Sequence, residues 1–213
     1  MGNLWVFQPS TGHCWLGKSD LFIPVPALDR IAGSIPKHEI DLFELLTDMH
    51  PHGLGVLLGV GKGNFAKELL SKWNGGVYLV DPYIYTIPSN SADDINQQLI
   101  YENLRRELHM QFENRFVNVR DFSYSLRPIW TEKKMPNPSF IYIDNNHNVT
   151  NDILTWWDIL APGGIIAGTQ YIKHSRAVDY VFKTKFKLPL NIIPTIQNGT
   201  WFAIKPLPSS SKI

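Results

Sequence analysis

Gly55-Val-Leu-Leu-Gly-Val-Gly-Lys-Gly-Asn-Phe-Ala-Lys-Glu-Leu-Leu70 joins an apolar run, three closely spaced glycines and an amphipathic segment. The apolar run over residues 54–58 predicts a strand that is buried on both faces, as in a parallel sheet. The residues after the glycines recur at helical spacing and predict a helix with one buried face. These residues are Phe65, Ala66, Leu69, Leu70 and Trp73.

The glycines Gly59, Gly61 and Gly63 permit a sharp turn and let a ligand approach the backbone closely. The N–H groups at the start of the following helix lack partners within the helix and would point at a ligand above the turn. This geometry favours a nucleotide or nucleoside cofactor. The alternative interpretation is a glycine-rich turn with no ligand.

Composition limits the classes of protein to consider. The chain has 213 residues, 44% hydrophobic and 18% charged, which is typical of one globular domain with an extension. Because 20 Lys and Arg nearly balance 19 Asp and Glu, we expect no partner among nucleic acids or membranes. The single Cys14 excludes an internal disulfide framework and favours a reducing compartment such as the cytoplasm.

The order of the remaining patterns predicts an α/β fold. Apolar periodicity predicts helices over residues 36–49, 93–114 and 150–160 and from Ser175 onward, and strands over 77–80, 115–119, 139–143 and 165–167. The stripe of the long helix over residues 93–114 that should be buried consists of Ile95, Leu99, Leu104, Leu108 and Phe112. Residues 128–138 should form a polar connection.

Two further strands close the chain. Residues 191–196 and 200–204 flank an Asn-Gly turn signal and should pair as an antiparallel hairpin. The repeated strand–helix alternation before them predicts a doubly wound, mostly parallel seven-stranded sheet that ends in this hairpin.

Two acidic residues, Asp81 and Asp121, follow predicted strands in the first half of the fold. Asp81 ends the second strand, 20 residues after Gly61, where an acid commonly binds ribose hydroxyls in nucleotide-binding α/β folds. The alternative is an Asp that caps its own loop. Asp121 follows the third strand, and open α/β sheets bind ligands at the carboxyl ends of their strands.

Five strand–helix units closed by a hairpin resemble the class I S-adenosylmethionine-dependent methyltransferases, a Rossmann-like family, over about residues 38–205. The segments Phe140-Ile-Tyr-Ile-Asp-Asn-Asn-His147 and Leu160-Ala-Pro-Gly-Gly-Ile-Ile-Ala-Gly-Thr-Gln-Tyr171 are similar to those of one subgroup. That subgroup contains small-molecule O-methyltransferases related to catechol and macrolide-sugar (macrocin) enzymes.

The resemblance implies S-adenosyl-L-methionine as cofactor and assigns residues to it. The glycine-rich turn would lie against its methionine part, Asp81 would bind its ribose, and Asp121, Phe122 and Ser123 would flank its adenine. The full set of cofactor-binding residues implied is Gly59, Val60, Gly61, Lys62, Gly63, Phe65, Asp81, Pro82, Tyr83, Asp121, Phe122, Ser123 and Asp144.

Three positions depart from the family pattern. Leu57 replaces the acid that helps hold the cofactor's amino group. Asn146 and Gln170 replace two carboxylates of the subgroup's divalent-metal site. Because Mg²⁺ prefers charged oxygen ligands, we expect no metal site and metal-independent chemistry, or no catalysis.

Transfer of a methyl group to a hydroxyl requires a base that removes the proton. His147 is the first candidate, with Asp144 orienting it or acting in its place. The alternative role for His147 is to cap the following helix or to form a local hydrogen bond.

These observations lead to competing hypotheses. The first is an active methyltransferase that acts on a small-molecule acceptor. The second is a catalytically silent domain that binds the cofactor or a partner, and the third is an NAD-dependent oxidoreductase, because Gly61, Gly63 and Ala66 also fit a dinucleotide fingerprint. The expected organisation is an extension over residues 1–36 that serves as a lid or as a homodimer contact, a binding domain over 37–206 and a tail over 207–213.

Overall fold

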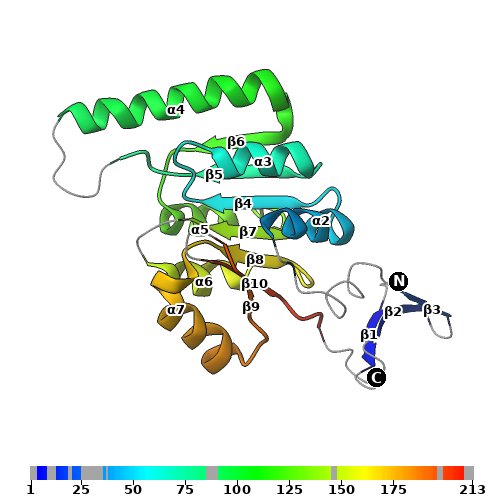
Figure 1. Cartoon of the computed structure of the whole chain (residues 1–213). Coiled ribbons are helices and arrows are strands. Elements are labelled where there is room, and N and C mark those ends of the chain that lie inside the picture. The colour runs from blue at the N-terminus through cyan, green and yellow to red at the C-terminus, as the bar shows by residue number, and fades with distance from the viewer. Residues whose placement is uncertain are drawn as a thin grey trace.

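A seven-stranded sheet with helices on both faces forms the main body of the protein (Figure 1). The computed structural model describes residues 4–8, 13–18, 21–24, 36, 38–84, 91–144, 148–195 and 199–208. The strands of this sheet are β4 (Leu54–Leu58), β5 (Gly76–Val80), β6 (Phe116–Val119), β7 (Phe140–Ile143), β8 (Ile165–Gly168), β9 (Asn191–Ile193) and β10 (Thr200–Ile204).

The order of strands across the sheet is β6-β5-β4-β7-β8-β10-β9. The first five are parallel, whereas β10 is antiparallel to both β8 and β9. The predicted doubly wound, mostly parallel sheet with a terminal hairpin is therefore confirmed. The turn at residues 196–198 lies outside the described residues.

Six α-helices surround the sheet in the described part of the chain (Figure 1). They are α2 (Glu39–Met49), α3 (Asn64–Lys72), α4 (Ser91–Phe112) with a 3₁₀ turn η1 (Glu113–Arg115), α5 (Ser123–Glu132), α6 (Val149–Trp157), and α7 (Tyr171–Asp179), which continues as a π-helix η2 (Tyr180–Phe186).

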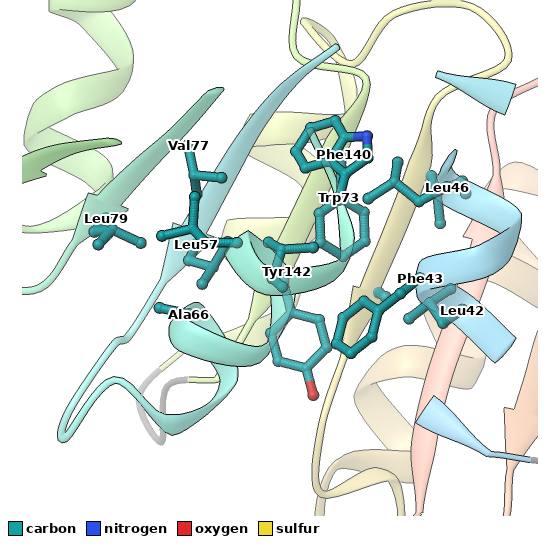
Figure 2. Close-up of a cluster of buried hydrophobic side chains, with 14 of the residues drawn as sticks. Leu42, Phe43, Leu46, Leu57, Ala66, Trp73, Val77, Leu79, Phe140 and Tyr142 are labelled. Carbon is teal, nitrogen blue, oxygen red and sulfur yellow. The ribbon is translucent and has the colours of Figure 1, made fainter. Parts of the chain in front are cut away.

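Alternation along the buried strands divides the core into two clusters. Leu57 and Tyr142 point to one face, where they meet Phe43 of α2 and Ala66 of α3 (Figure 2). Neighbouring residues such as Leu58 point to the opposite face, which α5, α6, α7 and η2 cover. Because successive side chains in a strand alternate between faces, the continuous apolar run supplies both clusters.

The direction in which the chain builds the sheet reverses between β4 and β7. The chain first builds outward from β4 through β5 to β6 and then returns to the other side of β4 as β7 and β8. Connections on the two sides therefore diverge where β4 and β7 end side by side. Ligands of open α/β sheets bind at such a point.

Two arginines that flank β6 fasten the neighbouring helices. Arg115 donates hydrogen bonds to the carbonyl oxygens of Trp73 and Leu70, where α3 ends. A cation at the C-terminus of a helix also interacts favourably with its dipole. Arg120 donates to Gln98 Oε1 at 2.5 Å and lies 5.3 Å from the ring centre of Tyr101, which links it to α4.

Three sequence-based expectations need correction. The polar connection expected over residues 128–138 begins inside α5, because Leu126 and Trp130 are buried against the sheet and this burial offsets the helix-breaking effect of Pro128. The helix expected from Ser175 begins at Tyr171. Leu99 was assigned to the buried stripe of α4 but is 51% exposed, whereas Leu104 and Leu108 are buried.

The N-terminal extension contains regular structure that its sequence did not predict. Strands β1 (Leu4–Gln8), β2 (His13–Lys18) and β3 (Leu21–Pro24) form a separate antiparallel sheet in the order β1-β2-β3. The role of the extension as a lid or a dimer contact stays a prediction. Among the helices that the structure describes, none combines the length and the hydropathy of a membrane span.

Gly61 and Gly63, in the turn after β4, have similar backbone conformations but different surroundings, so substitutions at the two positions test how tightly α4 packs on the turn. Both have left-handed φ angles, +75° at Gly63 and +51° at Gly61. A Cβ atom at Gly63 would lie 2.2 Å from Cδ1 of the buried Leu104, whereas a Cβ at Gly61 would have no atom within 4 Å.

We predict that Gly63→Ala destabilises the protein more than Gly61→Ala. The left-handed backbone costs both variants about 1–2 kcal/mol. The clash with Leu104 should cost Gly63→Ala a further ~1–3 kcal/mol. Urea denaturation measures both free energies of unfolding, and equal losses would show that α4 does not press on the turn.

Candidate functional site

A cavity of about 500 Å³ lies at the carboxyl edge of the sheet, next to the ends of β4, β5 and β7. Its volume is typical of small-molecule sites. The ends of β4, β5 and β7 form its floor, and the first turns of α5 and α6 form its wall. The lining residues are Gly59, Val80, Asp81, Pro82, Ile84, Phe122, Ser123, Tyr124, Asp144, Asn148, Asn151 and Asp152.

The carboxylate of Asp81 holds the glycine turn in place. Its Oδ2 accepts hydrogen bonds from the backbone N–H groups of Val60 at 2.8 Å and Gly61 at 2.9 Å. Its Oδ1 accepts from the N–H of Tyr83 at 2.8 Å. Gly59 adds a backbone bond to the Val80 carbonyl at 2.9 Å. The end of β5 therefore fixes the shape of the turn after β4.

Three carboxylates supply the charge of the cavity lining. Asp81, Asp144 and Asp152 all line it, and the lining residues of the described chain include no Lys, Arg or His. The field of these groups attracts positive charge and hydrogen-bond donors and opposes anions. The cavity is therefore suited to a ligand that is rich in hydroxyl, amino or cationic groups.

A buried polar pair forms part of the wall. The Ser123 hydroxyl donates a hydrogen bond to Asp152 Oδ1 at 2.5 Å, and Asp152 is only 5% exposed. Asp152 lies in the first turn of α6, where the helix dipole favours negative charge. The Asn148 side chain caps the same helix by accepting from the N–H of Asn151 at 3.1 Å.

Apolar and aromatic side chains complete the lining of the cavity. The rings of Phe122 and Tyr124 are stacked, with centroids 5.1 Å apart and an angle of 16° between their planes. Tyr124 is 59% exposed and Ile84 is 47% exposed. A flat ligand can therefore contact aromatic and aliphatic surface while its polar groups meet the carboxylates.

The structure brings six of the predicted site residues together on the cavity: Gly59, Asp81, Pro82, Phe122, Ser123 and Asp144. Val60 and Gly61 contribute through their bonds to Asp81. Lys62 is exposed on the turn, and Gly63 is buried beneath Leu104 of α4.

Other predicted site residues do not line the cavity. Phe65 stacks on Tyr142 with ring centres 3.6 Å apart and packs against the core. The carboxylate of Asp121 accepts a hydrogen bond from the N–H of Phe122 at 2.7 Å. His147, the candidate base, lies outside the described residues, as do Asn145 and Asn146.

Tyr83 also points into the core, where it is 2% exposed and its ring lies 5.1 Å from that of Tyr101. Burial, with the nearby Asp81 carboxylate as a second cause, raises the pKa of its phenol above the ordinary value. Within the described chain its hydroxyl has no hydrogen-bond partner. Tyr83 is therefore a neutral phenol, and its backbone N–H is the group that contacts Asp81.

Sequence reasoning missed half of the lining residues: Val80, Ile84, Tyr124, Asn148, Asn151 and Asp152. One signal was present for Asp152. The predicted helix from residue 150 places it in a first turn that follows the end of a strand, which is where helix N-termini face ligands in α/β folds. Tyr124 carried no such signal, because its position depends on the start of the unexpected α5.

Two of the three positions that depart from the family pattern, Leu57 and Gln170, lie in the described residues. Leu57 is 1% exposed and belongs to the core between the sheet and α2 and α3. Gln170 precedes α7 in a left-handed conformation with a φ of 55°. In the part of the chain that the structure describes, no three His, Cys, Asp or Glu side chains gather as metal ligands would.

Solved structures resemble this chain in fold at low sequence identity. A protein from *Staphylococcus aureus*, proposed to be a caffeoyl-CoA O-methyltransferase, has 13% identity and a TM-score of 0.58, with 83% of this chain and 88% of that chain covered. A methyltransferase from *Geobacter sulfurreducens* has 17% identity and a TM-score of 0.55, with 85% and 87% covered.

An O-methyltransferase from *Bacillus cereus*, solved in complex with SAH, has 13% identity and a TM-score of 0.53, with 84% of this chain and 88% of that chain covered. No family model and no curated protein matches the sequence. The chain therefore has the fold of class I methyltransferases, at an identity where the likeness speaks for the fold alone.

We predict that Asp81→Ala loosens the glycine turn. The loss of three charge-assisted hydrogen bonds should lower the free energy of unfolding by about 2–4 kcal/mol, because each contributes ~1.5–3 kcal/mol and water partly replaces it. Hydrogen exchange at the Val60 and Gly61 amides should become faster.

The matched control is Asp121→Ala. Its carboxylate accepts one hydrogen bond, from the adjacent Phe122 N–H, so the loss should stay below about 1.5 kcal/mol. Unchanged exchange at Val60 and Gly61 in Asp81→Ala would contradict the role of Asp81.

Proposed function

We propose that this protein binds S-adenosyl-L-methionine in the cavity at the carboxyl edge of the sheet and methylates a hydroxyl group of a small molecule without a metal ion. One observation carries the proposal. A cavity on a methyltransferase fold is lined by carboxylates, and one of them, Asp81, holds the glycine turn.

Asp81 has capacity left for a ribose hydroxyl. A carboxylate offers about four acceptor sites. The N–H groups of Val60 and Gly61 occupy both sites of Oδ2, and that of Tyr83 occupies one site of Oδ1. The remaining site suits one hydroxyl donor, so the loop-capping and ribose-binding interpretations of Asp81 are compatible.

The rest of the lining fits the other parts of this cofactor. The stacked rings of Phe122 and Tyr124 offer apolar surface to a purine. The negative field of Asp81, Asp144 and Asp152 favours a ligand that carries a sulfonium and an ammonium group. Both properties support S-adenosylmethionine over a ligand with phosphate groups.

S-adenosylmethionine supplies an activated methyl group when it is bound, so the protein has mainly to align the acceptor and remove its proton. We assign removal of this proton to His147, which follows β7 in the sequence. Asp144, which lines the cavity, orients this imidazole or accepts the proton itself. Asn146 and Gln170 provide neutral amides where a magnesium site needs carboxylates, which favours metal-independent chemistry.

The leading alternative is a catalytically silent domain that binds the cofactor or a partner. Leu57 favours it, because its burial in the core leaves no carboxylate at the position that usually helps hold the cofactor's amino group. An NAD-dependent oxidoreductase is disfavoured, because three carboxylates line the cavity and would repel a pyrophosphate.

Isothermal titration calorimetry with S-adenosylmethionine, S-adenosylhomocysteine and NAD separates these functions. We expect both sulfur nucleosides to bind and NAD not to bind. Asp81→Ala should weaken binding of the nucleosides about tenfold or more, since a charge-assisted hydrogen bond contributes ~1.5–3 kcal/mol.

Failure of the wild type to bind either sulfur nucleoside would contradict the proposed function. A folded Asp81→Ala protein with unchanged affinity would remove the ribose role of Asp81. Binding without turnover across a broad panel of hydroxylated acceptors would favour the silent alternative.

We predict that EDTA leaves methyl transfer unchanged. The measurement is transfer of a labelled methyl group to the acceptor, before and after exhaustive chelation. An activity that falls on chelation and returns with Mg²⁺ would show that the amides at positions 146 and 170 do not prevent metal binding.

A further inference from the structure

The Ser123–Asp152 pair differs from the other polar groups of the cavity because the direction of the Ser123 hydroxyl hydrogen is known from its hydrogen bond. A serine hydroxyl carries one hydrogen and two lone pairs. The hydrogen of Ser123 points to Asp152 Oδ1 at 2.5 Å. The Ser123 oxygen can therefore only accept hydrogen bonds from a ligand in the cavity.

Asp152 keeps the hydroxyl in this orientation. The carboxylate is 5% exposed and lies in the first turn of α6, so water does not compete freely for the bond and the helix dipole favours the charged acceptor. Both members of the pair line the cavity. This part of the cavity wall therefore offers hydrogen-bond acceptors to a ligand, and the bond to Asp152 keeps the Ser123 hydroxyl from acting as a donor.

We infer that Asp152 is a positioning residue that sets nucleobase specificity: it fixes Ser123 as an acceptor and selects a purine with an amino group at C6 over one with an oxygen there. The inference rests on the proposed function, in which the purine of the cofactor packs on Phe122 and Tyr124, the two residues on either side of Ser123 in the cavity lining. The amino group of adenine donates hydrogen bonds, whereas the C6 oxygen of hypoxanthine only accepts them.

The difference between the two bases should be large for this geometry. A 6-oxo group would bring its lone pairs against those of Ser123, and both oxygens would be left without a donor. Sites built to hydrogen-bond a ligand reject an analogue that cannot form the bond far more strongly than apolar sites reject a change in size.

Calorimetry with S-adenosylhomocysteine and S-inosylhomocysteine tests the inference, because these ligands differ at the C6 side of the purine. We expect the wild type to bind the adenine form at least about tenfold more tightly, as befits one lost hydrogen bond. Asp152→Ala should bring the affinity ratio toward one, because the Ser123 hydroxyl loses its acceptor and its hydrogen can turn toward a 6-oxo group. Ser123→Ala should also bring the affinity ratio near one.

Two further variants serve as controls. Ser123→Thr retains a hydroxyl and should keep the preference, and Asp158→Asn changes an exposed carboxylate beyond the end of α6 and should keep both affinities. Thermal unfolding followed by circular dichroism identifies any variant that does not fold, in which case Ser123→Ala decides.

The ratio of the affinities for S-adenosylhomocysteine and S-inosylhomocysteine separates a role in specificity from a structural role. A distorted cavity would lower both affinities together and leave their ratio unchanged. A wild type that binds both ligands equally, or variants that keep its preference, would overturn the inference while leaving the proposed function intact. Failure to bind either ligand would instead count against the proposed function.

Discussion

The carboxylate of Asp81 is the point on which the site depends. A turn with three left-handed glycines has little conformational preference of its own, and its N–H groups need acceptors. Asp81 provides them from the end of the neighbouring strand, so the pairing of β4 with β5 also fixes the turn and the start of α3. The hydrogen bonds of this one side chain therefore couple the shape of the cavity to the pairing of the strands.

The division of the core into two faces explains which site positions could carry polar groups. Leu57 and Leu58 lie next to each other on β4 but belong to opposite clusters, and both are buried. A carboxylate in place of Leu57 would face Phe43 and Tyr142 instead of solvent (Figure 2). The polar groups of the site therefore come from residues just past the strand ends, such as Asp81 and Asp144.

Much of the fold could be predicted from local patterns, because β4, β7 and β8 are continuous apolar runs that only a sheet covered on both faces can bury. The start of α5 could not, since Pro128 argues against a helix and the burial of Trp130 that compensates for it is a tertiary effect. Tertiary packing also decided which site residues could be predicted. Asp81 followed a strand and was predicted, whereas Tyr124 and Asp152 reach the cavity only through the packing of α5 and α6.

The borders of the main sheet have a consequence for how this protein meets its neighbours in a crowded solution. One border strand, β9, has three residues, and the other, β6, has four and is bracketed by Arg115 and Arg120. Short and charge-flanked borders give an incoming strand few backbone groups to pair with. The sheet is therefore protected against growth into continuous intermolecular β-structure, and association between copies is directed to other surfaces.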